Sequence, residues 1–250
     1  MTYEDEYERL VAQTYDGVYA VVRDPSGDAA FYRSLADEVG GPLLELGCGT
    51  GRTLLPVAES GVECVGLDAS TEMLAVLRQK GIPENVTLEH GRIETFDLGD
   101  GRFRLITCPF RALQHLLDPQ TQLSALRNIR RHLDPTGVFT FDVFDPNLAR
   151  TAVAEEPESL DATFEYQGQE VRRYASVARD LSTQVSTVTF RFESDRVELA
   201  GSTRIHMRWF YRYELEHLLA RAGFGDLTFY RDFKRTPWSS GAETVVVARL

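Results

Sequence analysis

Apolar residues recur at helical spacing over residues 3–22, which predicts an amphipathic helix. A second helix is predicted over residues 28–39. From residue 42 the pattern changes to short apolar runs that alternate with helical segments. The predicted strands are 42–47, 62–67, 86–89, 103–108 and 138–144, and the helices between them are 51–60, 70–80 (with Ser70 as N-cap) and 119–133. This alternation predicts an α/β fold with a parallel sheet covered by helices on both faces.

The alternation stops between residues 150 and 208. Two β-rich stretches there, EVRRYASVARD and TQVSTVTFRFE, have no helix between them, and they predict an antiparallel insert. A helix over 211–224 and strands over 227–233 and 243–250 follow. The expected parts are an N-terminal helical lid over 1–40, a core domain made of 41–149 and 209–250, and a β-rich insert over 150–208 that forms a lid or a dimer interface.

Composition narrows the class of protein. The formal net charge is −11, which argues against binding to a nucleic-acid backbone, because that requires a basic face. No apolar run approaches the length of a membrane span, and the acidic N-terminus does not resemble a signal peptide. The three cysteines are too few for a disulfide scaffold. We therefore expect a cytoplasmic protein with neither nucleic-acid nor membrane partners.

The strongest local feature is LLELGCGTGR, residues 43–52. Gly47, Gly49 and Gly51 permit a tight turn and let a ligand lie against the backbone. The next strand ends in Asp68, and a carboxylate there suits the two hydroxyl groups of a ribose. A phosphate-binding loop would need Gly-Lys-Ser/Thr and a dinucleotide fold prefers G-x-G-x-x-G, and this sequence has neither.

ELGCGTG, Asp68 within VGLDAS and the following EML resemble motifs I and II of the class I S-adenosylmethionine (SAM)-dependent methyltransferases. The resemblance covers nearly the whole chain. It implies SAM as cofactor and a Rossmann-like seven-stranded sheet of order 3-2-1-4-5-7-6, with strand 7 antiparallel. The cofactor-binding residues that it implies are Tyr19, Glu45, Gly47, Cys48, Gly49, Gly51, Arg52, Asp68, Ala69, Met73, Arg92, Ile93 and Pro109.

The resemblance implies a role for several of these residues. Glu45 would orient the loop or reach the ammonium group of SAM, Asp68 would hold the ribose, and Ala69 and Met73 would pack on the adenine. Residues 91–96 match the loop that faces the adenine.

Many relatives have an acid directly after the glycine of that loop, where this sequence has Arg92. The backbone of Arg92 and Ile93, or the side chain of Glu94, would then contact the adenine.

In this fold the methyl group points past the strand 103–108, towards CPFRALQHL, residues 108–116. Methyl transfer requires alignment of the acceptor and removal of its proton where it has one to lose. His115 is a candidate base, with a packing role as the alternative. Arg111 is expected either to pair with an anionic group of the acceptor or to form a structural ion pair. Cys108 precedes Pro109 and is expected to be buried and inert.

Small-molecule N-methyltransferases, including those that act on amino sugars, have a similar stretch after strand 4. They also match YDGVY, residues 15–19. In that interpretation Tyr15 and Tyr19 close over the cofactor or the acceptor, and a core role is the alternative. Arg208 and Tyr211 are candidates for the wall of the acceptor pocket. The histidines and cysteines show no metal-ligand spacing, so we predict no metal site.

Together these features predict a SAM-dependent methyltransferase that acts on nitrogen or oxygen of a small-molecule acceptor, with His115, Tyr15 and Arg111 as catalytic residues and a homodimer through the insert as an option. Four alternatives remain. They are a protein- or RNA-directed methyltransferase, a non-catalytic SAM-binding subunit, a fold that uses SAM for another reaction, and a dehydrogenase.

Overall fold

The computed structural model describes residues 3–22, 25–99, 102–196, 200–241 and 243–250. The chain forms two compact units. The insert unit comprises Met1–Pro25 and Leu148–Arg208, and the sheet unit comprises Ser26–Asn147 and Trp209–Leu250. The two helices expected within residues 1–40 therefore fall in different units. No described helix combines the length and the apolar composition needed to cross a membrane.

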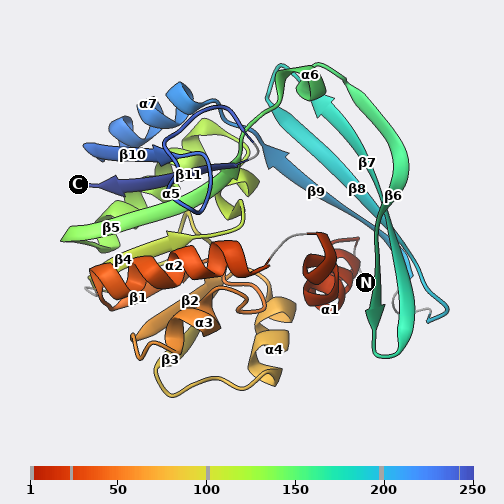
Figure 1. The fold of residues 1–250 in the computed structure, drawn as a ribbon, viewed down its shortest axis with the longest axis horizontal. Coiled ribbons are helices and arrows are strands. Elements are labelled where there is room, and N and C mark those ends of the chain that lie inside the picture. Colours follow the sequence, from red (N-terminus) through yellow and green to blue (C-terminus); the bar gives the residue numbers. More distant parts are fainter. Residues whose placement is uncertain (1–2, 23–24, 100–101, 197–199, 242) are drawn as a thin grey trace. The chain divides into compact units, whose positions relative to one another are not determined.

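The sheet unit is built on a seven-stranded sheet within the described part of the chain (Figure 1). Its strands are β1 (Leu43–Leu46), β2 (Cys64–Asp68), β3 (Val86–His90), β4 (Phe103–Cys108), β5 (Leu133–Phe144), β10 (Asp226–Tyr230) and β11 (Glu243–Arg249). Their order is β10-β11-β5-β4-β1-β2-β3, and β11 is antiparallel to both neighbours. The other pairs are parallel. The expected strand order and the antiparallel last strand are confirmed.

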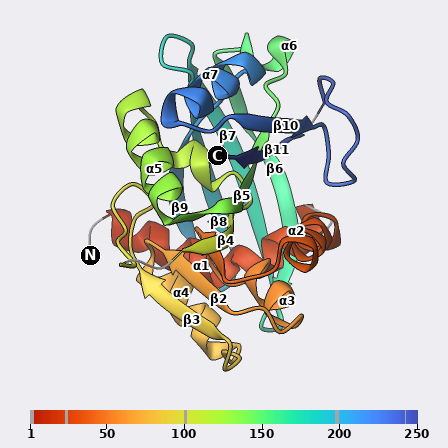
Figure 2. The ribbon, with the colours of Figure 1, turned by 90° about the vertical axis from the view of Figure 1, so that its left-hand side faces the viewer.

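Helices cover both faces of this sheet, as predicted (Figure 2). One face packs against α2 (Pro25–Val39), α3 (Leu54–Ala58) and α4 (Thr71–Gln79), and the other against α5 (Pro119–His132) and α7 (Arg212–Ala222). Local chemistry sets where the helices begin. The Ser70 side chain accepts a hydrogen bond from the Met73 amide at 3.2 Å, which confirms the predicted N-cap of α4.

Residues 134–137 depart from the prediction. The sequence DPTG is typical of a turn, yet these residues lie within β5. Leu133 pairs with Phe103 and Val138 pairs with Leu105, so the register shifts where the extra residues are accommodated. The turn chemistry persists inside the strand, because the Thr136 amide donates to Asp134 Oδ1 at 2.8 Å.

The insert unit contains a four-stranded antiparallel sheet in the order β6-β7-β8-β9 among its described residues. Its elements are α1 (Tyr3–Val22), α6 (Leu148–Thr151), β6 (Glu155–Tyr166), β7 (Gln169–Asp180), β8 (Val185–Glu193) and β9 (Gly201–Arg208). The predicted antiparallel insert is thereby confirmed. Leu10 and Val18 of α1 pack against Phe164 and Phe192 of this sheet. Gly17 allows this close approach, since a Cβ atom added there would lie 2.7 Å from Phe164 Cδ2.

Candidate functional site

The glycine loop, residues 47–51, connects β1 to α3. Gly47, Gly49 and Gly51 have φ angles of 70°, 53° and 81°, which residues with a side chain rarely adopt. A Cβ atom added at Gly51 would lie 2.4 Å from Leu77 Cδ1, whereas one added at Gly49 would meet no atom within 4 Å. Packing against α4 therefore requires Gly51, and Gly49 borders open space.

Asp68, the last residue of β2, holds the glycine loop through its carboxylate. Oδ2 accepts a hydrogen bond from the Gly49 amide at 2.7 Å, and Oδ1 accepts one from the Ser70 amide at 2.8 Å. Burial raises the pKa of this carboxyl group, and the two amide hydrogen bonds oppose that shift. An ionised carboxylate offers about four lone-pair sites. Asp68 can therefore accept further hydrogen bonds from a ligand that carries hydroxyl groups.

Glu45 of β1 is buried next to the start of the glycine loop, with 1% of its surface exposed. Its Oε1 atom accepts a hydrogen bond from Thr53 Oγ1 at 2.7 Å, whereas Oε2 has no hydrogen-bond partner among the described residues. Burial raises the pKa of Glu45 to about 8, an effect larger than the opposing one of the Thr53 hydrogen bond. The carboxyl group is therefore mostly protonated and neutral at pH 7.

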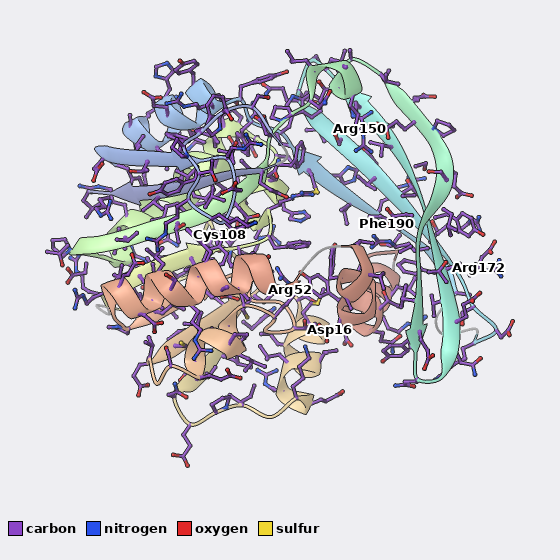
Figure 3. The ribbon with its side chains drawn as sticks, in the orientation of Figure 1. Asp16, Arg52, Cys108, Arg150, Arg172 and Phe190 are labelled. Atoms are coloured by element: carbon purple, nitrogen blue, oxygen red, sulfur yellow. The ribbon has the colours of Figure 1, made fainter. Side chains whose placement is uncertain are left out.

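Arg52 follows the glycine loop and pairs with Asp28 of α2. Its Nη1 and Nη2 atoms donate to the two carboxylate oxygens of Asp28 at 2.8 and 2.7 Å, and the Asp28 side chain is completely buried. The Arg52 guanidinium group also lies over the Phe110 ring, 4.9 Å from its centroid. Arg52 (Figure 3) thus connects the loop to α2 and to the segment after β4. Its contact with a cofactor stays a prediction.

Four further residues expected near the cofactor lie at or beyond the carboxyl ends of the adjacent parallel strands β2 and β3, and Pro109 follows β4. Ala69 follows β2, Met73 lies in the first turn of α4, and Ile93 lies just beyond β3. Arg92 donates from Nε to Glu94 Oε1 at 2.6 Å. The Arg92 side chain is 71% exposed and that of Glu94 only 16%.

The loop over residues 91–98 is fixed by two side chains of α5 that the sequence analysis did not single out. Asn128 Nδ2 donates to the Phe96 carbonyl oxygen at 2.8 Å. The Leu98 amide donates to His132 Nε2 at 3.2 Å. The helical pattern placed Asn128 and His132 on α5 but carried no signal of the backbone groups that they bind.

The three cysteines are buried: Cys48 in the glycine loop, Cys64 in β2 and Cys108 at the end of β4 (Figure 3). Burial raises the pKa of all three thiols. The expectation that Cys108 is buried is confirmed. A buried thiol with a raised pKa is a poor nucleophile.

The segment after β4 carries the residues expected on the acceptor side. His115 is the last residue of η1 (Ala112–His115), a short helix that the sequence did not predict, and its side chain is exposed. Arg111 Nη2 donates to Glu243 Oε1 of β11 at 2.6 Å. Of the two roles weighed for Arg111, the structure contains the ion pair. Its role in catalysis stays a prediction.

The predicted aromatic and pocket-wall residues are distributed over both units. The rings of Tyr15 and Tyr19, both on α1, are in contact with their centroids 4.4 Å apart and their planes tilted by 55°. In the insert unit, buried Arg208 donates to the Thr183 carbonyl oxygen at 3.3 Å. In the sheet unit, Tyr211 precedes α7 and is 42% exposed. The roles of these residues stay predictions.

Within the described residues, no group of three or more His, Cys, Asp or Glu side chains is arranged to hold a metal ion.

Comparison with known proteins agrees with this geometry. Residues 43–137 match a family model described as a methyltransferase domain. Two curated relatives from Streptomyces match about half of the chain. The cypemycin N-terminal methyltransferase of Streptomyces sp is 29% identical over 56% of this chain and 57% of its own. The dTDP-3-amino-3,6-dideoxy-alpha-D-glucopyranose N,N-dimethyltransferase of Streptomyces fradiae is 33% identical over 53% of this chain and 52% of its own. The chain thus spans about half the length of the curated relatives that it matches.

A solved structure extends the similarity to nearly the full length. The CcbJ methyltransferase from Streptomyces caelestis superposes with a TM-score of 0.79 at 28% sequence identity, over 98% of this chain and 97% of that one. The similarity therefore includes the insert as well as the sheet unit. With its strand order, its glycine loop and Asp68, the chain has the Rossmann-like fold expected of a class I SAM-dependent methyltransferase, and its residues 43–137 match the methyltransferase domain.

Proposed function

We propose that this protein transfers a methyl group from SAM to a nitrogen or oxygen atom of a small-molecule acceptor. The observation that carries the proposal is the joint geometry of Gly49 and Asp68. Gly49 presents backbone without a side chain next to open space. The Asp68 carboxylate accepts a hydrogen bond from the amide of the same glycine. The two curated relatives and CcbJ, all named as methyltransferases, support it, and the first two names specify a peptide N-terminus and an amino sugar.

The residues of the glycine loop and β2 fit SAM. The open space beside Gly49 can admit a ligand, and Asp68 has lone pairs left for the two ribose hydroxyl groups. Glu45 adds a buried carboxyl oxygen that lacks a hydrogen-bond partner among the described residues. When bound, SAM supplies an electrophilic methyl group whose departure leaves a neutral thioether.

On the acceptor side, the protein needs to align the attacking atom and accept its proton. Ligands of open α/β sheets bind beyond the carboxyl ends of the strands, and η1 follows the carboxyl end of β4. His115 is exposed there, and an imidazole suits proton removal near neutral pH. No covalent nucleophile is required, in keeping with the burial of Cys108.

Titration calorimetry with SAM and separately with NAD tests the cofactor. We expect saturable binding of SAM and none of NAD. Tight binding of NAD without binding of SAM would overturn the proposal in favour of a dehydrogenase.

An assay with methyl-labelled SAM and cell extract tests the class of acceptor. After the reaction the extract is separated into small-molecule and macromolecular fractions, and we expect label in the first. Label in protein or RNA would favour a macromolecule-directed enzyme. Binding of SAM without any transfer would favour a non-catalytic subunit.

Asp68→Ala is expected to weaken SAM binding by about 1–3 kcal/mol, because polar partners lose their acceptor. The same change releases the Gly49 amide from the carboxylate. Calorimetry measures the dissociation constant. Asp226→Ala is the matched control, since the Asp226 side chain is 64% exposed at the far edge of the sheet. An unchanged affinity for SAM in Asp68→Ala would remove Asp68 from the site.

His115→Ala is expected to lower the turnover number by about 10²-fold if the imidazole accepts the acceptor proton. SAM affinity should change little. Turnover is measured with the small-molecule fraction as acceptor. His217→Ala, which alters an exposed histidine of α7, controls for surface effects. A normal turnover number in His115→Ala would leave the histidine with a packing role.

A further inference from the structure

The segment after β4 contains two successive residues in the left-handed region. Phe110 has a φ angle of 56° and Arg111 one of 64°. Residues with a Cβ atom seldom adopt this conformation, and they keep it only where the surroundings hold it. Such backbone is concentrated at functional sites. The question is therefore which side chains hold this segment.

The first side chain that fixes this segment is Asp142 of β5. Cys108 pairs with Phe141, so Asp142 lies next to the point where β4 ends. Pro109 lacks an amide hydrogen, and the next donor in the chain is the Phe110 amide. That amide donates to Asp142 Oδ1 at 2.7 Å.

Asp142 is itself fully buried, and a side chain of α2 donates a hydrogen bond to its carboxylate. The Tyr32 hydroxyl group donates to the same Oδ1 atom at 2.7 Å, and both residues have 0% of their surface exposed. Burial and the neighbouring carboxylate raise the pKa of the Tyr32 hydroxyl group, so it stays a donor. The oxygen that binds Phe110 is thus fixed in position.

The far side of the segment is held by β5 and β11. The Arg111 guanidinium group donates to Glu243 and lies over the Phe144 ring, 5.5 Å from its centroid. The Phe144 amide donates to Gln114 Oε1 at 3.1 Å. Residues 110–114 are therefore tied to the ends of two neighbouring strands, and His115 follows directly.

We propose that Asp142 is a positioning residue that holds residues 109–115 in the geometry required for methyl transfer. This inference rests on the proposed function. Asp142 acts through the Phe110 backbone. Misplacement of a reacting group by about 1 Å can slow a reaction about 10²-fold. Among the described residues, Phe110 and Tyr32 donate to Asp142 Oδ1, and both lie outside the glycine loop. We therefore expect SAM affinity to change little when Asp142 is replaced.

The test compares Asp142→Ala, Asp142→Asn and Tyr32→Phe. Asp142→Ala removes the acceptor of the Phe110 amide, and we expect turnover to fall about 10-fold to 100-fold while the dissociation constant of SAM changes by less than about threefold. Asp142→Asn keeps an oxygen acceptor and should retain near-normal turnover. Tyr32→Phe removes a buried hydrogen bond of the same carboxylate but leaves Phe110 bound. It should lower the melting temperature, and it should lower turnover much less than Asp142→Ala does.

A second measurement needs no acceptor. Hydrogen exchange of the Phe110 amide, followed by NMR, should be at least about tenfold faster in Asp142→Ala than in the wild type, and protected in Asp142→Asn and Tyr32→Phe. If Asp142→Ala does not fold, Asp142→Ser replaces it, because its shorter side chain also withdraws the acceptor.

Wild-type turnover or wild-type exchange of the Phe110 amide in Asp142→Ala would overturn the inference. So would equal losses of turnover in Tyr32→Phe and Asp142→Ala, since both would then reflect stability alone. Failure of the proposed function gives a different result. The wild type would then neither bind SAM nor transfer methyl groups, while the exchange of the Phe110 amide would still respond to Asp142.

Discussion

Arg52→Ala is expected to lower the free energy of unfolding by about 3–5 kcal/mol, the usual cost of removing one partner from a buried ion pair. The Asp28 side chain has 0% of its surface exposed, and Arg52 supplies two hydrogen bonds to it. Without the guanidinium group, the buried Asp28 carboxylate loses both of these charge-assisted hydrogen bonds, while the Ala29 amide still donates to Oδ1 at 2.8 Å. Urea denaturation measures the change.

Two further variants make this prediction specific. Arg33→Ala breaks the exposed pair with Glu59, whose side chains are 46% and 68% exposed, and should cost at most about 1 kcal/mol. The double variant Arg52→Met with Asp28→Leu removes both charges and should recover much of the loss. If Arg52→Ala lowers the free energy of unfolding no more than Arg33→Ala does, the ion pair between Arg52 and Asp28 does not stabilise the fold as a buried pair.

Glu45→Gln is expected to change how the free energy of unfolding depends on pH. The folded-state pKa of Glu45 is about 8 because of burial, above the value near 4.3 of an unfolded chain. Between these values the folded protein binds a proton that the unfolded chain has released. Its stability therefore falls as pH rises through this window, by about 1.4 kcal/mol per pH unit. Glutamine has no such proton and removes this dependence.

The difference in stability between Glu45→Gln and the wild type should accordingly rise with pH, by about 5 kcal/mol from pH 4 to pH 8.5. Denaturation curves at several pH values without SAM measure it. Glu63→Gln, a change at an exposed position, is the matched control. If Glu45→Gln behaves like Glu63→Gln, the Glu45 carboxyl group titrates in the folded protein as it does in water.

Much of the fold followed from the sequence, because each strand and helix is encoded locally. The apolar runs predicted every strand of the seven-stranded sheet, with ends that differ by a few residues. The expected strand 42–47, for example, is Leu43–Leu46. The strand order came instead from the resemblance carried by the glycine loop and Asp68. Residues 134–137 were misassigned because an Asp-Pro-Thr-Gly turn and an irregularity within a strand share the same local chemistry.

The residues of the candidate site also fall into those that the local sequence identified and those that it did not. The glycine loop and Asp68 were found because a few neighbouring residues define them. The partners that hold the segment after β4 are remote, since Tyr32 and Asp142 are 110 residues apart and Arg111 and Glu243 are 132 apart. Asp142 did give a local signal, as the lone acid within VFTFDVF. An unexplained acid in an apolar strand predicts a buried partner but not which one.

The burial of all three cysteines makes the native chain suitable for site-specific labelling. Cys48, Cys64 and Cys108 have 4%, 2% and 0% of their surfaces exposed, so maleimide dyes should spare them while the protein is folded. Cysteines introduced at exposed Ala20 of α1 and Glu59 beyond α3 would place one dye on each unit. Energy transfer between the two dyes, with and without SAM, would then report the separation of the units in solution.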